Sequence, residues 1–211
     1  MKKFELTNEF ITNMFGTKLF RIRALVEFGD VEAGELGGYV EKESNLGHDD
    51  NAWVYDNAWV YGNAWVYGDA QVSGDARVYG NAWVYGDAQV SGDARVYGNA
   101  RVYGNAWVYG NAWVYGNAWV YGNALVCSDE DYAYAHGFGS VNRTTTFFRL
   151  KDGGVGVRCG CFYGTLAQFR DKIRETHGET KKAQEYLMLA DLMELRFEED
   201  ENEVGNRKYV E

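Results

Sequence analysis

A six-residue repeat occupies the middle of the chain and constrains its fold more than any other feature. Thirteen consecutive hexads run from 51 to 128 without an insertion, and most of them read N/D-A-x-V-Y/S-G. Ala and Val alternate with large or polar residues, so A-x-V-Y predicts a four-residue strand with Ala and Val on one face. The Gly-Asn or Gly-Asp pair that follows is typical of a turn. Each hexad is therefore expected to form one strand and one corner.

A second period sets the number of corners in one turn of the chain. Residues 69–86 and 87–104 are identical except that Trp83 is replaced by Arg101. Three hexads therefore form one eighteen-residue coil, and we expect such coils to stack about 4.8 Å apart. A coil with three short sides predicts a mainly β fold, a triangular parallel β-helix. The spacing of an aliphatic residue and a small residue four positions later resembles the left-handed hexapeptide β-helix, which implies that handedness.

Residues eighteen positions apart are expected to stack, which sorts the outward side chains into columns on three sides. The first side carries Trp53, Gln71, Gln89, Trp107 and Leu125. The second side carries Trp59, Arg77, Arg95 and Trp113 beside Tyr61, Tyr79, Tyr97 and Tyr115. The third side carries Trp65, Trp83, Arg101 and Trp119 beside Tyr67, Tyr85, Tyr103 and Tyr121, with a corner column of Asn63, Asn81, Asn99 and Asn117. All three sides are expected to present aromatic rings outward.

Composition and charge argue against several classes of protein. With 46% hydrophobic residues, 211 residues suffice for a core. No apolar run follows Lys2 and Lys3, and no stretch approaches eighteen apolar residues, so we expect a cytoplasmic protein without a membrane anchor. The cysteines, Cys127, Cys159 and Cys161, lack the spacing of a disulfide framework, which agrees with a reducing compartment. A net charge of −10 without a basic stripe argues against duplex nucleic acid as a partner.

The first fifty residues are expected to cap one end of the solenoid. Strands at 3–6 and 18–25 flank a turn near 13–16, and a cap is needed because an open end exposes unpaired strand edges. Gly38-Tyr39-Val40 then echoes the repeat and Leu46 follows Val40 by six positions, which predicts an irregular coil before the first regular one. The predicted units are the N-terminal β cap with its irregular coil (1–50), the solenoid (51–128) and a C-terminal cap domain (129–211).

The C-terminal domain is expected to hold a hairpin and two helices. A loop runs through His136 and Gly139, and strands at 144–150 and 155–161 then form a hairpin about 152–154. Thr165-Leu166-Ala167-Gln168 fits a capping box, which predicts a helix that ends at His177-Gly178. The apolar residues of this helix share one face, at Leu166, Phe169 and Ile173. A second helix is expected over 181–197, followed by a solvated acidic tail at 198–203.

The segment that leads into the repeats resembles a known family. The runs at 21–25, 28–34 and 37–40, R-I-R-A-L, F-G-D-V-E-A-G and G-G-Y-V, followed by G/N-A-x-V-Y repeats, look like the start of the YdcK-type β-solenoid family. The resemblance covers about the first 128 residues and implies the solenoid fold. Many relatives are uncharacterised phage and prophage proteins, which implies a phage-encoded protein in a host cytoplasm. The acetyltransferase label of the family rests on the repeat alone, and a fold does not define an activity.

Residues that could carry catalysis or hold a metal lie outside the coils. Acyltransferases of the hexapeptide class place a catalytic His at a coil edge, whereas the hexads contain no His. We interpret the three histidines, His48, His136 and His177, as loop residues and a helix-end cation. Cys159-Gly160-Cys161 could bind a metal with Cys127 or His136, but packing at a strand end is favoured. We therefore predict no catalytic residue, no cofactor and no metal site.

The outward aromatic columns favour a non-enzymatic binding or assembly protein, because an ordinary monomer leaves little contiguous apolar surface exposed. The partner is either a second copy of the chain or a host protein. The third side has the least charge, so it is the predicted contact of a dimer or trimer. The residues of this contact are Trp65, Trp83, Trp119, Tyr67, Tyr85, Tyr103 and Tyr121.

Two alternative functions remain open. In the first, Arg77, Arg95 and Arg101 bind a small anion such as a signalling nucleotide, whose base stacks on Tyr79 or Tyr97. Trp59 and Trp113 flank these arginines, and Asp75 and Asp93 at the adjacent corner could instead neutralise them. The second alternative is an acyltransferase of the hexapeptide class that uses His48 or His136.

Overall fold

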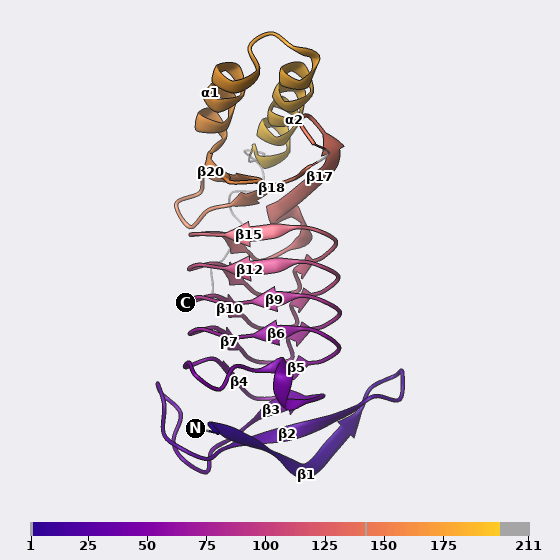
Figure 1. The fold of residues 1–211 in the computed structure, drawn as a ribbon, viewed down its shortest axis with the longest axis vertical. Helices are drawn as coiled ribbons and strands as arrows, with labels where there is room; N and C mark the ends of the chain where they lie inside the picture. Colours follow the sequence, from indigo (N-terminus) through magenta and orange to yellow (C-terminus); the bar gives the residue numbers. More distant parts are fainter. Residues whose placement is uncertain (1, 142, 199–211) are drawn as a thin grey trace.

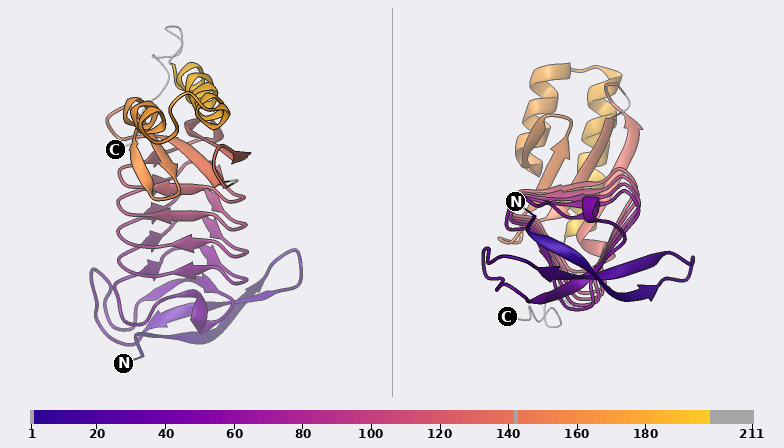
Figure 2. Two further views of the ribbon diagram at one scale, coloured as in Figure 1. Left: turned by 45° about the horizontal axis from the view of Figure 1, so that its top comes forward. Right: turned by 60° about the horizontal axis from the view of Figure 1, so that its bottom comes forward.

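The chain forms a column of stacked coils with a cap at each end (Figure 1). The computed structural model describes residues 2–141 and 143–198. The N-terminal sheet closes one end of the column, and a sheet covered by two helices closes the other (Figures 1 and 2). The chain is thus a β-solenoid with a small C-terminal α+β domain, which confirms the predicted mainly β fold.

The strands of the solenoid form three parallel sheets, one for each side. The first side consists of β4 (Trp53–Val54), β7 (Gln71–Val72), β10 (Gln89–Val90), β13 (Trp107–Val108) and β16 (Leu125–Val126). The second side contains β5 (Trp59–Val60), β8 (Arg77–Val78), β11 (Arg95–Val96) and β14 (Trp113–Val114). The third side contains β6 (Trp65–Val66), β9 (Trp83–Val84), β12 (Arg101–Tyr103) and β15 (Trp119–Tyr121). Each strand pairs with the strand eighteen residues away, as predicted.

The interior is filled by the Ala and Val of every hexad. Ala88 and Val90 are fully buried, as are the equivalent residues of the other regular coils.

The strands are shorter than predicted. They hold two or three paired residues instead of four, because a glycine in left-handed geometry turns the chain in most hexads. At Gly86, for example, φ is +68°, and an added Cβ would lie 3.0 Å from the backbone nitrogen of Gly104. Glycine therefore allows neighbouring corners to stack closely.

The N-terminal cap extends the sheet of the second side. Its strands are β1 (Phe4–Thr12), β2 (Lys18–Ala24) and β3 (Leu36–Val40), and β3 pairs in parallel with β5. A 3₁₀ turn at Glu43–Asn45 follows, and a bridge from Leu46 to Val66 confirms the irregular coil. The first strand is longer than predicted, because a bulge between Leu6 and Phe10 lets the pairing with β2 continue.

The structure corrects the expectation that Trp53 presents its ring at the surface. Trp53 stacks in the predicted column, in register with Gln71, yet it is fully buried. The rings of Phe4 and Phe28 pack edge-on against the indole, with centroids at 6.2 and 5.3 Å. The N-terminal cap thus covers Trp53, the one tryptophan of the first coil that is fully buried.

Carboxylates satisfy backbone amides at the N-terminal end of the solenoid. Gly62 N–H donates to Glu41 Oε2 and Gly68 N–H donates to Asp50 Oδ2, both at 2.6 Å. Buried Lys3 donates from Nζ to the carbonyl oxygens of Asp50 and Ala52, both at 2.8 Å, and its burial lowers its pKa. Lys3 Nζ thus gives the Ala52 carbonyl oxygen the hydrogen bond that a backbone N–H of a further coil would donate.

The C-terminal domain is a four-stranded antiparallel sheet with two helices. After a 3₁₀ turn at Asp129–Asp131, the sheet has the order β17 (Tyr132–Phe138), β18 (Arg143–Arg149), β19 (Val155–Cys159) and β20 (Phe162–Thr165). The predicted hairpin is confirmed as β18 and β19. The predicted loop through His136 is wrong, because Tyr132–Phe138 pairs with β18 along its length.

Both predicted helices are confirmed. The first is α1 (Leu166–His177), with the reciprocal capping box between Thr165 and Gln168, and the second is α2 (Lys181–Phe197). Their buried residues pack on the sheet in a core separate from that of the solenoid. The predicted tail lies outside the described residues beyond position 198. No helix in the described part of the chain is long and apolar enough to span a membrane.

Candidate anion-binding site

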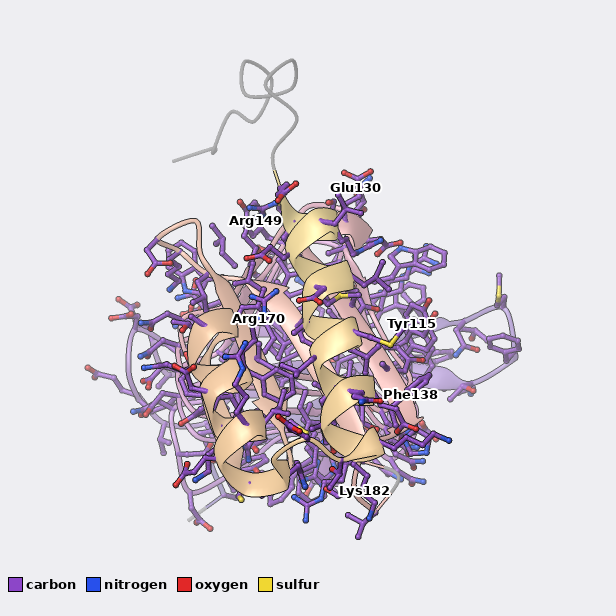
Figure 3. All side chains as sticks on the ribbon, turned by 90° about the horizontal axis from the view of Figure 1, so that it is seen from above. Tyr115, Glu130, Phe138, Arg149, Arg170 and Lys182 are labelled. Atoms are coloured by element: carbon purple, nitrogen blue, oxygen red, sulfur yellow. The ribbon has the colours of Figure 1, made fainter. Side chains whose placement is uncertain are left out.

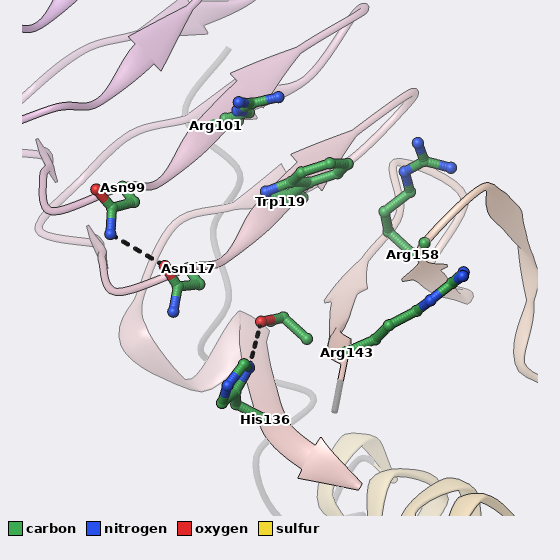
Figure 4. Close-up of a pocket in the computed structure, with 9 residues that line it drawn as sticks. Asn99, Arg101, Asn117, Trp119, His136, Arg143 and Arg158 are labelled. Atoms are coloured by element: carbon green, nitrogen blue, oxygen red, sulfur yellow. Dashed lines mark hydrogen bonds between the residues drawn. The ribbon is translucent and has the colours of Figure 1, made fainter. Parts of the chain in front are cut away.

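A cavity lies where the third side of the solenoid meets the C-terminal sheet (Figure 4). Strands β15 and β18 are joined there, because the backbone N–H of Trp119 donates to Thr146 Oγ1 at 3.0 Å. The cavity volume is about 490 Å³. This junction pocket is lined by Asn99, Arg101, Asn117, Trp119, His136, Arg143, Thr144, Arg158 and Gly160.

Cations and indole rings alternate along the solenoid wall of the junction pocket. The Arg101 guanidinium lies over the rings of Trp83 and Trp119, 4.6 and 4.8 Å from their centroids. The Arg158 guanidinium, from β19, lies 5.4 Å from the centroid of Trp119. Such cation–π contacts hold a guanidinium by its face and leave the N–H groups at its edge available to an acceptor.

Arg158 and Arg143 bring two further guanidinium groups from the C-terminal sheet. Arg158 is held in place, since Nε donates to Tyr103 Oη and Nη1 donates to the Phe162 carbonyl, both at 3.1 Å. Arg143 crosses Gly160, where φ is +59° and where an added Cβ would overlap the guanidinium. The glycine therefore gives Arg143 access to the mouth of the junction pocket.

Among the described residues, no carboxylate lines the junction pocket. Within the described residues, none of Arg101, Arg143 and Arg158 forms an ion pair, whereas Arg23 and Arg170 of the same chain do. The chain as a whole carries a net charge of −10, so acidic side chains are not scarce. Three guanidinium groups around one cavity repel one another unless an anion balances them. The arrangement is therefore suited to a ligand with several negative charges.

Neutral polar groups complete the lining. The corner asparagines of the third side form a row in which each Nδ2 donates to the Oδ1 of the next, at 3.1–3.2 Å. The row ends at Asn117, whose Nδ2 has no acceptor among the described residues and lies at the pocket (Figure 4). His136 Nδ1 lies 2.9 Å from Thr144 Oγ1. These groups can add hydrogen bonds to an anion without adding charge.

The structure separates Arg101 from the two arginines with which we expected it to act. Arg77 and Arg95 pair on the second side, in register with each other, while Arg101 lies in β12 and lines the junction pocket. Each second-side guanidinium lies over an indole: Arg77 is 4.3 Å from the centroid of Trp59, and Arg95 is 4.6 Å from that of Trp113.

The corner aspartates do not neutralise Arg77 and Arg95 in the structure. Within the described chain, neither Asp75 nor Asp93 forms an ion pair with an arginine, and the indoles hold the cations instead.

A nucleotide base cannot stack on Tyr79 or Tyr97 as expected, because other tyrosines occupy the faces of both rings. Tyr79 stacks between Tyr61 and Tyr97, at 5.0 and 4.9 Å, and Tyr97 stacks on Tyr115 at 5.3 Å. Because each of these two rings has a tyrosine neighbour on both sides, neither face of Tyr79 or Tyr97 is open to a ligand.

The predicted oligomer contact on the third side is partly occupied within the chain. Its tyrosines form the expected column, with successive centroids 4.3–4.9 Å apart. At the C-terminal end, Tyr163 packs edge-on against Tyr121 at 4.6 Å, and Arg158 reaches Trp119 and Tyr103. Trp65, at the other end, keeps 39% of its surface exposed.

The remaining candidate residues lie apart. His48 stacks on Phe4 in the N-terminal cap at 4.3 Å, and His177 ends α1. Cys159 is buried in the helix–sheet core, which confirms its packing role, while Cys161 is exposed. The described residues contain no group of three His, Cys, Asp or Glu side chains that could hold a metal ion.

Sequence reasoning missed Arg143 and Arg158, which complete the junction pocket. Arg158 lies in the predicted hairpin and Arg143 directly precedes it, and both are single cations without a repeat. Only the docking of that hairpin on β15 brings them to Arg101.

The stacked eighteen-residue coils define the chain as a β-solenoid protein. Residues 52–68, 70–86, 88–104, 94–110, 100–116 and 106–122 match the family model described as YdcK Beta solenoid repeat. The match covers repeats only, so the C-terminal wall of the junction pocket lies outside it. No curated protein matches the chain.

Proposed function

We propose that this chain is a non-catalytic binding protein that holds a small phosphate-bearing ligand in the junction pocket. The observation that carries the proposal is the convergence of Arg101, Arg143 and Arg158 on one cavity to which the described residues contribute no carboxylate. Guanidinium groups bind phosphate oxygens through paired, charge-assisted hydrogen bonds. A volume of about 490 Å³ is within the usual range of ligand sites and far exceeds one phosphate ion. We therefore expect a ligand with more than one anionic group, such as a nucleotide.

A binding role is favoured over acyl transfer by the surroundings of His136. Its Nδ1 lies 2.9 Å from Thr144 Oγ1, and among the described residues no carboxylate pairs with it, which is the partner that usually orients a general base. Sequestration of a host signalling nucleotide by a phage-encoded protein would require the binding site and no catalysis. Turnover of acetyl-coenzyme A that is lost in His136→Ala would contradict this proposal.

Calorimetry against pyrophosphate, ATP, GTP, cyclic dinucleotides and acetyl-coenzyme A tests the site. We expect at least one of these probes to bind, and Arg143→Ala to weaken binding about 10-fold to 100-fold, the size of a lost charge-assisted hydrogen bond. Arg143 is exposed, so its removal should leave the fold intact. Arg77→Ala is the matched control and should leave affinity unchanged. Absence of heat from every probe, or equal losses in the two variants, contradicts the proposal.

Self-association through the third side remains a second proposed role, supported by the exposed Trp65 and the uncovered N-terminal part of that side. Light scattering on Trp83→Glu should then show a dimer or trimer dissociating, because the carboxylate cannot be buried against a second apolar surface. Trp107→Glu on the first side serves as the control. A wild-type monomer at tens of micromolar would rule out this role.

A further inference from the structure

The junction pocket has a cationic flank and a neutral flank. Arg158 lies toward the C-terminal end of β15, with its guanidinium 5.8 Å from the ring centroid of Tyr121, the last residue of that strand. Asn117 precedes the N-terminal end of the same strand. Figure 4 shows Arg143 on the side of Arg158 and His136 on the side of Asn117. Helices α1 and α2 pack on the other face of the C-terminal sheet (Figures 1 and 3). A ligand that fills both flanks therefore has an anionic end and an uncharged polar end.

The neutral flank is the end of an amide row, which consists of Asn63, Asn81, Asn99 and Asn117. Each Nδ2 donates to the Oδ1 of the next asparagine, so the row has one direction along the solenoid. At its start, Lys42 Nζ donates to Asn63 Oδ1 at 3.3 Å. An ammonium group can only donate, so this contact requires the oxygen of Asn63 and favours the same orientation in every later amide. The row therefore presents a donor, Asn117 Nδ2, to the pocket about 14 Å from Asn63.

This orientation limits what Asn117 can bind. Its Oδ1 accepts from Asn99 Nδ2 at 3.1 Å, while its own Nδ2 has no acceptor among the described residues. An asparagine with both amide atoms free pairs with adenine, because it accepts from N6 and donates to N7. Guanine presents two acceptors, O6 and N7, on the same edge. As a donor alone, Asn117 suits guanine and cannot satisfy the amino group of adenine.

We propose that the junction pocket selects guanine nucleotides over adenine nucleotides and that Asn117 recognises the base. This inference rests on the proposed function, because it requires phosphates at Arg143 and Arg158. With the phosphates on the cationic flank, the base lies on the neutral flank, and a cavity of about 490 Å³ has room for both. Asn99 is a positioning residue, since it occupies the Oδ1 of Asn117 and thereby keeps the amide from turning.

Calorimetry of the full chain with GTP, ATP and tripolyphosphate, in the absence of divalent cations, tests this selectivity. GTP and ATP carry the same phosphates, so the ratio of their affinities depends on the base alone. Tripolyphosphate measures the cationic flank without a base. We expect wild type to bind GTP more tightly than ATP by at least about fivefold, the lower limit for one base-specific pair of hydrogen bonds.

Variants of the amide row separate recognition from folding. Asn117 is exposed, so Asn117→Ala should fold, bring the ratio of GTP to ATP affinity to about one and leave tripolyphosphate binding unchanged. Asn99→Ala frees Oδ1 of Asn117, so the ratio should fall through a gain in ATP affinity, an effect that a structural role alone would not produce. Asn111→Ala is the matched control, because Asn111 is an exposed corner asparagine that does not line the pocket.

The three probes distinguish a failure of this inference from a failure of the proposed function. Equal affinities for GTP and ATP, tighter binding of ATP, or a preference for GTP that survives in Asn117→Ala would overturn the inference. If tripolyphosphate still binds in any of these cases and Arg143→Ala weakens it, the proposed function stands. The absence of binding by all three probes would overturn both.

Discussion

Replacement of Asp131 by alanine is expected to lower the free energy of unfolding by about 3–5 kcal/mol, the cost of removing one partner of a buried ion pair. Asp131 is 1% exposed and lies where the solenoid joins the C-terminal domain. Its Oδ2 accepts hydrogen bonds from the backbone N–H groups of Cys127 and Ser128, both at 3.0 Å, and its Oδ1 lies 3.4 Å from Arg149 Nε. The variant loses all of these contacts at once.

Thermal denaturation should show this loss as a decrease in Tm of about 10 °C. Asp131→Asn keeps a side-chain oxygen for the backbone amides, so its Tm should lie between those of wild type and Asp131→Ala. Glu130→Ala, an exposed neighbour, should change stability by no more than about 0.5 kcal/mol. If Asp131→Ala melts within 1 °C of wild type, the two units are not held together by this residue.

A second large effect is expected at alkaline pH, where the tyrosine columns lose their neutral form. Tyr85 stacks between Tyr67 and Tyr103 at 4.9 and 4.7 Å. Burial, together with the neighbouring phenols of Tyr103 and Tyr67, raises the pKa of Tyr85 to about 12. Burial also raises the pKa of several other tyrosines in the columns and caps, which include Tyr61, Tyr67, Tyr79, Tyr97, Tyr103 and Tyr132.

These shifts define the direction of the pH dependence. A phenol whose pKa is higher in the folded chain than its ordinary value of 10.0 stabilises the fold fully below pH 10. That contribution is lost as the pH rises from 10 through the folded pKa near 12. The Tm should therefore stay constant up to pH 10 and decrease steeply above it. Absorbance at 295 nm should show that the phenols ionise at a higher pH than free tyrosine. Tyr85→Phe should reduce the decline, and tyrosines that titrate near pH 10 in a folded chain would contradict the account.

The solenoid could be predicted in detail because one short period sets every contact of a coil with its neighbours. The exchange of Trp83 for Arg101 within an otherwise identical pair of coils was enough to place Arg101 between two tryptophans. The amide row of the third side follows in the same way from a column that contains only asparagine. Handedness does not follow from this period, and the left-handed form remains an expectation of the resemblance.

Features that depend on docking between different units could not be predicted. Trp53 has the same local sequence as the exposed tryptophans, and only the fold of the N-terminal cap over it explains its burial. The strand Tyr132–Phe138 is interrupted by glycine and short on β-branched residues, so its pairing with β18 supplies what its propensity does not. The junction pocket also depends on docking between units, because Arg143 and Arg158 reach Arg101 only when β17–β20 pack on the end of the solenoid.

Anomalous diffraction from crystals soaked in tungstate is the most direct test of the junction pocket as an anion site. Tungstate is a strongly scattering tetrahedral oxyanion that resembles phosphate in shape and charge. The account predicts an anomalous peak in the junction pocket, within hydrogen-bond distance of the Arg143 guanidinium and of Arg101 or Arg158, and its loss in Arg143→Ala. A peak at Arg77 and Arg95 with none in the junction pocket, or no peak at any arginine, would contradict the account.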